Sequence, residues 1–147
     1  MIDFDRDVPK VELAFMNEDH AEATQITNLL LSALATDPPD ATKITEIFTR
    51  LLQHNREHFA REEEQMQQFD FPPYPVHQRE HGIVLTEMAA ELDAWTKTAD
   101  LERLKHYARI TLTNWFVNHI ATMDTITARY IAGAGGENLI EGDEIIK

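Results

Sequence analysis

Apolar residues recur every three or four positions in four long segments of the chain, which is the spacing of helices that bury one side. The segments run from about residue 17 to 35, 41 to 69, 76 to 98 and 101 to 130. In the first three, the apolar positions are Ile26, Leu29, Leu30 and Leu34; then Ile44, Ile47, Phe48, Leu51, Leu52, Phe59 and Met66; then Val84, Leu85, Met88, Leu92 and Trp95. In the fourth, the buried side is predicted to hold Leu101, Leu104, Ala108, Leu112, Trp115, His119, Met123, Ile126 and Tyr130.

Breaks in the pattern separate these segments. DPPD at 37–40 ends the first, and its last residue, Asp40, can cap the second. FDFPPYP at 69–75 ends the second with three prolines, Asp100 can cap the fourth, and GAGG at 133–136 stops it. Four helices with short connections pack as antiparallel neighbours, so we predict an all-α, up-down-up-down antiparallel four-helix bundle.

The length of 147 residues suits one domain, 1–147, which can bury a sizeable core. We expect the bundle core to span about 12–132. A proline-containing N-terminal arm precedes it, and a short acidic tail, 133–147, follows it. No strand pattern of useful length and no internal repeat competes with this organisation.

The composition limits the kinds of metal site and of binding partner that the chain can have. The chain has no cysteine, so a metal would be held by His, Asp and Glu, a donor set that favours iron, manganese or zinc. The formal net charge of −13 repels phosphates, which argues against nucleic-acid binding. No run of apolar residues approaches a membrane span, and the acidic start lacks the pattern of a signal peptide, so we expect a soluble cytoplasmic protein without membrane contact.

Histidines and carboxylates fall on the predicted buried sides of all four helices. Two pairs lie four residues apart, which stacks both side chains of a pair on one helix face: His58 with Glu62, and His77 with His81. His20 lies in the first segment. Each alone has an ordinary interpretation, such as a hydrogen-bonded core histidine or a solvated ion pair, but five of seven histidines on inward faces of four helices favour a metal site.

In the fourth segment, Asp124 follows His119 by five residues, which is about 140° around an α-helix. We therefore expect Asp124 to reach a second metal rather than share one with His119 by simple stacking. Five imidazoles and two carboxylates also exceed the needs of one tetrahedral zinc, whereas two metals bridged by the carboxylates would use all seven.

Other metal proteins fit less well. HQREH at 77–81 matches a zinc-peptidase motif in which Glu80 would be a general base, but that interpretation leaves His20, His58 and Asp124 unexplained. Ferritin-like sites need Glu-x-x-His on two helices, and this motif does not occur in the chain. The phase of the helix instead directs Glu80 to the solvated flank, and of the run Glu62–Glu64 only Glu62 is in phase with His58.

The ordered pattern H…HxxxE…HxxxH…HxxxxD resembles the hemerythrin family, including its bacterial members and the HHE cation-binding group. The stretches HFAREEEQM, YPVHQREH and NWFVNHI resemble the family around these positions too, and the likeness spans roughly residues 12 to 130. It implies two non-haem iron ions with a bridging oxo or hydroxo group. By this resemblance the metal ligands are His20, His58, Glu62, His77, His81, His119 and Asp124.

The resemblance further implies that His77, His81 and His119 hold one iron, that His20 and His58 hold the other, and that Glu62 and Asp124 bridge them. Dioxygen would bind reversibly at the open position of the second iron, for oxygen storage, transport or sensing. A peroxidase-like, catalase-like or nitric-oxide-handling enzyme is the alternative, and an interaction module with a structural metal is another. An apolar wall would exclude water from the site, with Phe59, Trp115, Phe116, Ile120 and Met123 as candidates.

The chain departs from the family pattern around the first helix, where it reads MNEDHAEAT rather than a D-x-Q-H-x-x-L signature. His20 is consequently the ligand that the motif supports least. His54 lies one turn before His58, and we expect it to be a surface residue rather than a ligand. His106 is expected to be peripheral.

Overall fold

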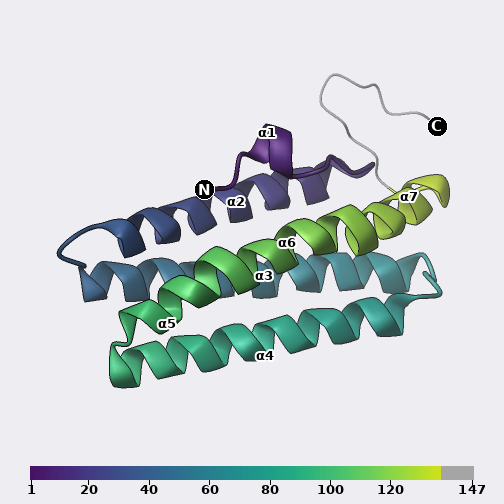
Figure 1. The fold of residues 1–147 in the computed structure, drawn as a ribbon. Coiled ribbons are helices and arrows are strands. Elements are labelled where there is room, and N and C mark those ends of the chain that lie inside the picture. Colours follow the sequence, from purple (N-terminus) through teal and green to yellow (C-terminus); the bar gives the residue numbers. More distant parts are fainter. Residues whose placement is uncertain (137–147) are drawn as a thin grey trace.

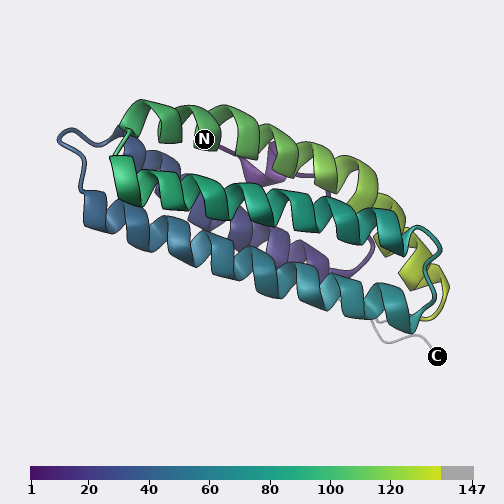
Figure 2. The same cartoon turned by 90° about the horizontal axis from the view of Figure 1, so that it is seen from below.

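A computed structural model describes residues 1–136 of the chain. These residues form helices and turns, and four long helical rods lie side by side with alternating direction (Figure 1), as the view from below in Figure 2 also shows. The first three rods are α2 (Ala14–Ala35), α3 (Ala41–Gln68) and α4 (Tyr74–Thr98). The fourth is continuous through α5 (Leu101–His106), η1 (Tyr107–Leu112), α6 (Thr113–His119), η2 (Ile120–Asp124) and α7 (Thr125–Gly133). The predicted all-α bundle is confirmed.

The predicted helix boundaries have the expected chemistry. The side chain of Asp40 accepts a hydrogen bond from the backbone N–H of Lys43, and that of Asp100 accepts one from Arg103. Both aspartates therefore cap a helix as predicted. Gly135, just past α7, has a φ of 98°, a conformation that glycine adopts without steric cost. Residues 137–147, most of the predicted acidic tail, lie outside the described part of the chain.

The N-terminal arm contains a short helix, α1 (Phe4–Asp7), that the sequence pattern did not indicate. The backbone of Ile2 exchanges hydrogen bonds with the side-chain amide of Asn28, at 2.9 and 2.8 Å. The amide of Asn17 does the same with the backbone of Val11. The arm is thus fastened along α2, and its residues Ile2, Val8 and Val11 are buried in the core.

The core consists of two apolar clusters. The larger one contains Phe48, Met88 and Leu104, and the smaller one contains Met16, Met66 and Ile131 together with apolar residues of the arm. Along each rod, the predicted metal-site residues fall near the boundary between the positions that contribute to the two clusters. The bundle therefore places a polar layer between two apolar regions. No helix in the described residues is long and apolar enough to cross a membrane.

The predicted buried side of the fourth rod is wrong beyond His119. Ile126 and Tyr130 are 58% and 39% exposed, whereas Thr127, Ala128 and Ile131 are buried. The cause is the π-helical segment η2, since a π turn takes one residue more than an α turn and moves every later position round the helix. In α2, Leu29 was also expected inside but is 48% exposed.

Both π segments end at a threonine that closes them. The hydroxyl of Thr125 donates to the carbonyl of Ile120 at 2.7 Å, and that of Thr113 donates to the carbonyl of Ala108 at 2.8 Å. Each bond spans five residues, one more than the usual threonine bond to the preceding helical turn. The hydroxyls therefore satisfy carbonyls at the places where the α-helical hydrogen-bond ladder changes register.

Candidate metal centre

The seven residues predicted to bind metal lie together in the polar layer of the bundle. α2 supplies one of them, and α3, α4 and the fourth rod supply two each. All seven side chains belong to residues no more than 3% exposed: His20, His58, Glu62, His77, His81, His119 and Asp124. His20, which the motif supported least, is as deeply buried as the others.

These side chains form two overlapping groups of metal-ligand atoms. Within each group the nitrogen and oxygen atoms lie within 4.8 Å of one another. The first group comprises Glu62, His77, His81, His119 and Asp124, and the second comprises His20, His58, Glu62 and Asp124. Both carboxylates belong to both groups, and each histidine belongs to one.

Each carboxylate directs one oxygen toward each group. Glu62 places Oε2 2.8 Å from His58 Nε2 and Oε1 3.2 Å from His81 Nε2. Asp124 places Oδ2 2.9 Å from His20 Nε2 and Oδ1 3.1 Å from His119 Nε2. This is the arrangement that two carboxylates need to bridge two neighbouring cations.

The expectation that His119 and Asp124 point too far apart to join one group is wrong. The segment between them, η2, is π-helical rather than α-helical. Because a π turn closes five residues on, it brings residues at that spacing to the same face. The bridging role proposed for Asp124 is thus compatible with a direct approach to His119.

Several buried polar atoms in the two groups have no neighbour in hydrogen-bonding geometry within the described residues, although imidazole nitrogens lie close to the carboxylate oxygens. They include both carboxylate oxygens of Glu62, Asp124 Oδ1 and His81 Nε2. In addition, the Nε2 atoms of His77 and His119 face each other at 3.1 Å. Buried polar groups without partners destabilise a fold, and cations would satisfy these atoms. Five imidazoles and two carboxylates therefore fit a two-metal centre.

Without cations, protons take over part of the charge balance. Burial disfavours protonated His58, but Glu62 and the bond to Asp19 outweigh it and raise its pKa to about 10. Burial likewise opposes charge on His81, yet Glu62 and Glu63 raise its pKa to about 9. Burial acts to raise the pKa of Glu62, but His58 holds it well below its usual value. Metal binding must therefore displace protons from this cluster.

Three of the histidines have an outer partner for the ring nitrogen that faces away from the centre. His58 Nδ1 lies 2.8 Å from Asp19 Oδ2, and His77 Nδ1 lies 2.8 Å from Thr127 Oγ1. His81 Nδ1 lies 2.9 Å from Glu63 Oε2. Such contacts fix the tautomer and ring orientation of a ligating histidine. Glu63, predicted to be solvated, is instead partly buried by its contact with His81.

Asp19 connects several groups beside the second group. Its carboxylate also accepts from Arg61 Nη2 at 2.7 Å. His54 Nε2 lies 3.1 Å from the backbone carbonyl of Asp19, and His54 Nδ1 lies 2.9 Å from Glu22. His54 is only 7% exposed, so the surface interpretation is wrong, and neither group of ligand atoms includes it. The spacing of one turn from His58 turns it inward against α2. His106 is exposed, as expected.

Replacing Asp19 with Asn is expected to weaken metal binding at the second group by about 10- to 100-fold. The amide keeps an acceptor for His58 but loses the charge that holds Arg61 and increases the basicity of the imidazole. Metal titration with a competing chelator measures the effect. Glu18→Gln, at the exposed neighbouring residue, removes the same charge and serves as control. Equal affinity in the two variants would contradict a positioning role for Asp19.

Aromatic rings cover the cluster on the side of α3 and α6. The ring of Phe59 stacks on His81 with centroids 3.9 Å apart, and Trp115 stacks on His119 at 4.5 Å. The indole N–H of Trp115 donates to Glu80 Oε1 at 2.9 Å. Glu80 was expected on the solvated flank but is partly buried by this contact. It belongs to neither ligand group, which removes support for a peptidase-type base.

Deletion of Ala121, an exposed residue within η2, is expected to preserve the cluster. The segment can close as an α turn, which leaves His119 and Asp124 four positions apart, the spacing of His58 and Glu62. Deletion of Gln78 is the control, because it leaves His77 and His81 three positions apart instead of four and rotates one relative to the other by about 100°. Metal content after loading should fall in the second variant only. Similar losses in both would show that the π turn itself is required.

Comparisons with known proteins agree on one family. The model of the hemerythrin HHE cation binding domain matches residues 11–131. A bacteriohemerythrin of Aquifex aeolicus is 30% identical over 124 residues, which cover 84% of this chain and 93% of that protein. A myohemerythrin of Sipunculus nudus is 33% identical over 90 residues, 61% of this chain and 64% of that one. A crystal structure of wild-type hemerythrin has the same fold, with a TM-score of 0.75 at 19% identity, covering 90% of this chain and 98% of the other.

Proposed function

The chain belongs to the hemerythrin HHE cation-binding family, and from this premise we propose that its centre holds two non-haem iron ions and binds dioxygen reversibly. The role would be oxygen storage, transport or sensing. The observation that carries the proposal is that Glu62 and Asp124 each direct one oxygen to each of two adjoining ligand groups. One mononuclear metal would leave part of this set unused.

In this proposal His77, His81 and His119 hold one iron, and His20 and His58 hold the other. Glu62 and Asp124 would contribute oxygens to both ions, together with a solvent-derived oxo or hydroxo group. The second iron has one protein ligand fewer, which leaves a position for a small ligand. When bound, the iron pair supplies the electrons and the coordination position that dioxygen needs.

The residues around the cluster favour binding without further reaction. Phe59 and Trp115 cover imidazole faces, and Phe116 lies edge-on to His20 with centroids 6.3 Å apart. Ile120 is fully buried, and Met123 is partly exposed. An apolar surround of this kind excludes water and external reductants from a bound ligand.

An enzyme with the same centre, acting on peroxide or nitric oxide, remains the alternative function. It would benefit from a proton donor in the pocket, but three of the four candidate hydroxyls have other contacts. Tyr130 donates to the carbonyl of Asp70, Thr122 donates to the carbonyl of Asn118, and Tyr74 accepts from Gln67. The buried hydroxyl of Tyr107 has no partner among the described residues, but Tyr107 lies in the larger apolar cluster rather than beside the ligand groups. These positions favour the oxygen-binding proposal. Peroxide consumption that rises in proportion to bound iron would favour the enzyme.

Metal content tests the centre itself. After loading with ferrous iron under nitrogen and removal of excess metal, the chain is expected to retain two iron ions. When zinc is added in competition with iron, we do not expect a protein that holds one zinc ion and no iron. One zinc per chain and no iron would contradict the proposal and revive the peptidase interpretation.

A further inference from the structure

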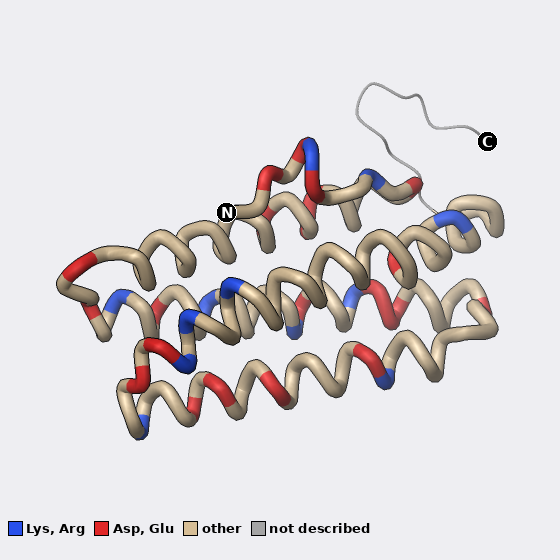
Figure 3. The backbone as a smooth tube through the Cα atoms, viewed as in Figure 1, with Lys and Arg blue, Asp and Glu red and all other residues tan. Residues whose placement is uncertain are grey.

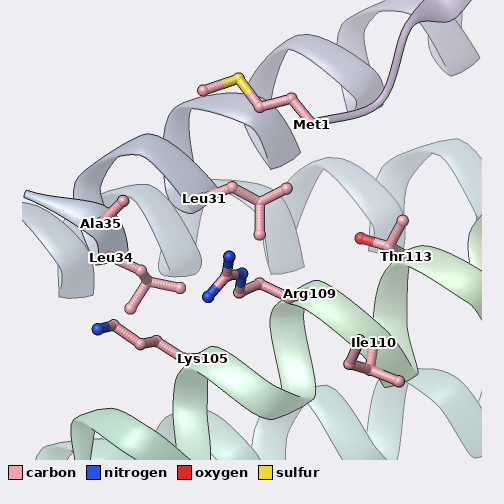
Figure 4. A pocket seen from close by; sticks show the side chains of 8 residues that line it. All are labelled: Met1, Leu31, Leu34, Ala35, Lys105, Arg109, Ile110 and Thr113. Carbon is pink, nitrogen blue, oxygen red and sulfur yellow. The ribbon is translucent and has the colours of Figure 1, made fainter.

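A pocket lies between α2 and the fourth rod, away from the candidate metal centre. Its volume is about 580 Å³, within the range of small-molecule sites. It contains none of the seven residues assigned to metal. Figure 4 shows the residues that line it: Met1, Leu31, Leu34, Ala35, Lys105, Arg109, Ile110 and Thr113.

Two cationic side chains share this pocket. Lys105 and Arg109 are four residues apart, and Figure 4 shows both charged ends directed toward α2. Like charges at this spacing repel each other. Lys105 has a carboxylate, Glu102, at 3.6 Å, and Arg109 has none within 4.0 Å among residues 1–136. The pair is thus poorly compensated in a chain that has a net charge of −13.

The opposite wall offers no countercharge. Residues 23–36 of α2 and its C-terminus contain no charged side chain, as the uncoloured half of this helix in Figure 3 shows. This wall contributes Leu31, Leu34 and Ala35, and Ile110, 50% exposed, lies on the other side. The pocket therefore combines an apolar surface with two cations, which is the character of a site for an amphipathic anion.

The backbone at the pocket is also irregular. Arg109 and Ile110 lie in η1, a π-helical segment that contains no residue of the metal cluster. The π turn of η2 brings His119 and Asp124 to the same face. The π turn of η1 has no such role at the metal centre, because none of the candidate ligands lies in it. π turns inside α-helices frequently mark functional sites. In this case two residues of the π segment, Arg109 and Ile110, line the pocket.

We propose that this pocket binds a small amphipathic carboxylate, with the anionic group between Lys105 and Arg109 and a short hydrocarbon body against Leu31 and Leu34. The planar guanidinium of Arg109 suits a carboxylate, which it can bind through two parallel hydrogen bonds. One negative charge matches the site better than several, because the acidic surface repels multiply charged anions. This proposal does not depend on the iron centre.

Calorimetric titration of the full-length, metal-loaded protein with octanoate tests the site. We expect one saturable site per chain, with a Kd between about 10 µM and 1 mM, as for ligands of this size. Acetate, which has the charge alone, and octanol, which has the chain alone, should each bind at least about tenfold more weakly, because the site uses both features. Equal binding of octanol and octanoate would overturn the proposal.

Variants locate the site. Arg109→Gln should weaken octanoate binding by about tenfold or more, since a charge-assisted bond is lost. Arg50→Gln removes the same charge from an exposed position on α3 and should leave binding unchanged. Ala35→Trp should block the pocket while keeping both cations. Wild-type affinity in Arg109→Gln and Ala35→Trp, with both variants folded by circular dichroism, would overturn the assignment, as would equal weakening in Arg50→Gln.

Discussion

Replacing Glu62 with Gln is expected to prevent the proposed two-iron centre from forming. Glu62 supplies an oxygen to each group of ligand atoms, so the substitution would take a charged bridge from both of the proposed iron ions at once. The amide keeps the size of the side chain but not its charge, and its N–H₂ group cannot bind a cation. We expect affinity for the iron pair to fall by more than about 100-fold, beyond the usual effect of an outer partner. Iron content after loading and gel filtration measures the loss.

Glu80→Gln is the matched control. Glu80 is also a carboxylate near the cluster and is partly buried, but its contact is the indole N–H of Trp115. The oxygen of a glutamine side chain can still accept that bond, so iron content should stay near two per chain. Equal losses in the two variants would contradict the assignment of Glu62 as a bridge.

Removal of the metals is expected to lower the thermal midpoint by roughly 10 to 20 °C. A ligand present at about 1,000 times its Kd stabilises the native state by about 4 kcal/mol, and 1 kcal/mol shifts the midpoint of a chain of this size by a few degrees. Protons on His58 and His81 compensate only part of the lost charge. Scanning calorimetry of the chelated and reloaded protein measures the difference.

The thermal midpoint of the apo-protein also distinguishes the proposed metal centre from the remaining alternative, an interaction module. If the chain were an interaction module with a merely incidental metal, the chelated and loaded forms would unfold at the same temperature. A restored midpoint on reloading with iron, and a smaller recovery in Glu62→Gln, is the expected outcome. An unchanged thermal midpoint after chelation would contradict the proposal that bound metal stabilises the fold.

The grouping of the seven candidate ligands could be predicted from sequence because helical spacing is a local property. A spacing of four residues indicates that two side chains lie on the same helix face, as in the pairs His58 with Glu62 and His77 with His81. The caps at Asp40 and Asp100 are local too, because each binds a backbone N–H three residues on. The same reasoning failed beyond His119, because it assumed an α-helix where η2 is π-helical. Thr125, five residues after the carbonyl it binds, is a feature consistent with that turn, but threonine alone does not predict it.

The outer partners could not be predicted because they depend on contacts between helices. Asp19 and Glu63 are acids on largely polar faces, and periodicity gives no sign that each meets a histidine from another helix. His54 shares a side with His58, yet whether it is covered depends on how closely α2 approaches α3. These residues are determined by packing, which a single sequence does not specify.

Reversible binding of dioxygen is the central claim, and the absorption spectrum of one iron-loaded sample tests it most directly. The ferrous protein, prepared under nitrogen, should gain oxygen-to-iron charge-transfer bands in air and lose them when oxygen is removed, through repeated cycles. An oxidised spectrum that forms on first exposure to air and does not revert under nitrogen would contradict the claim.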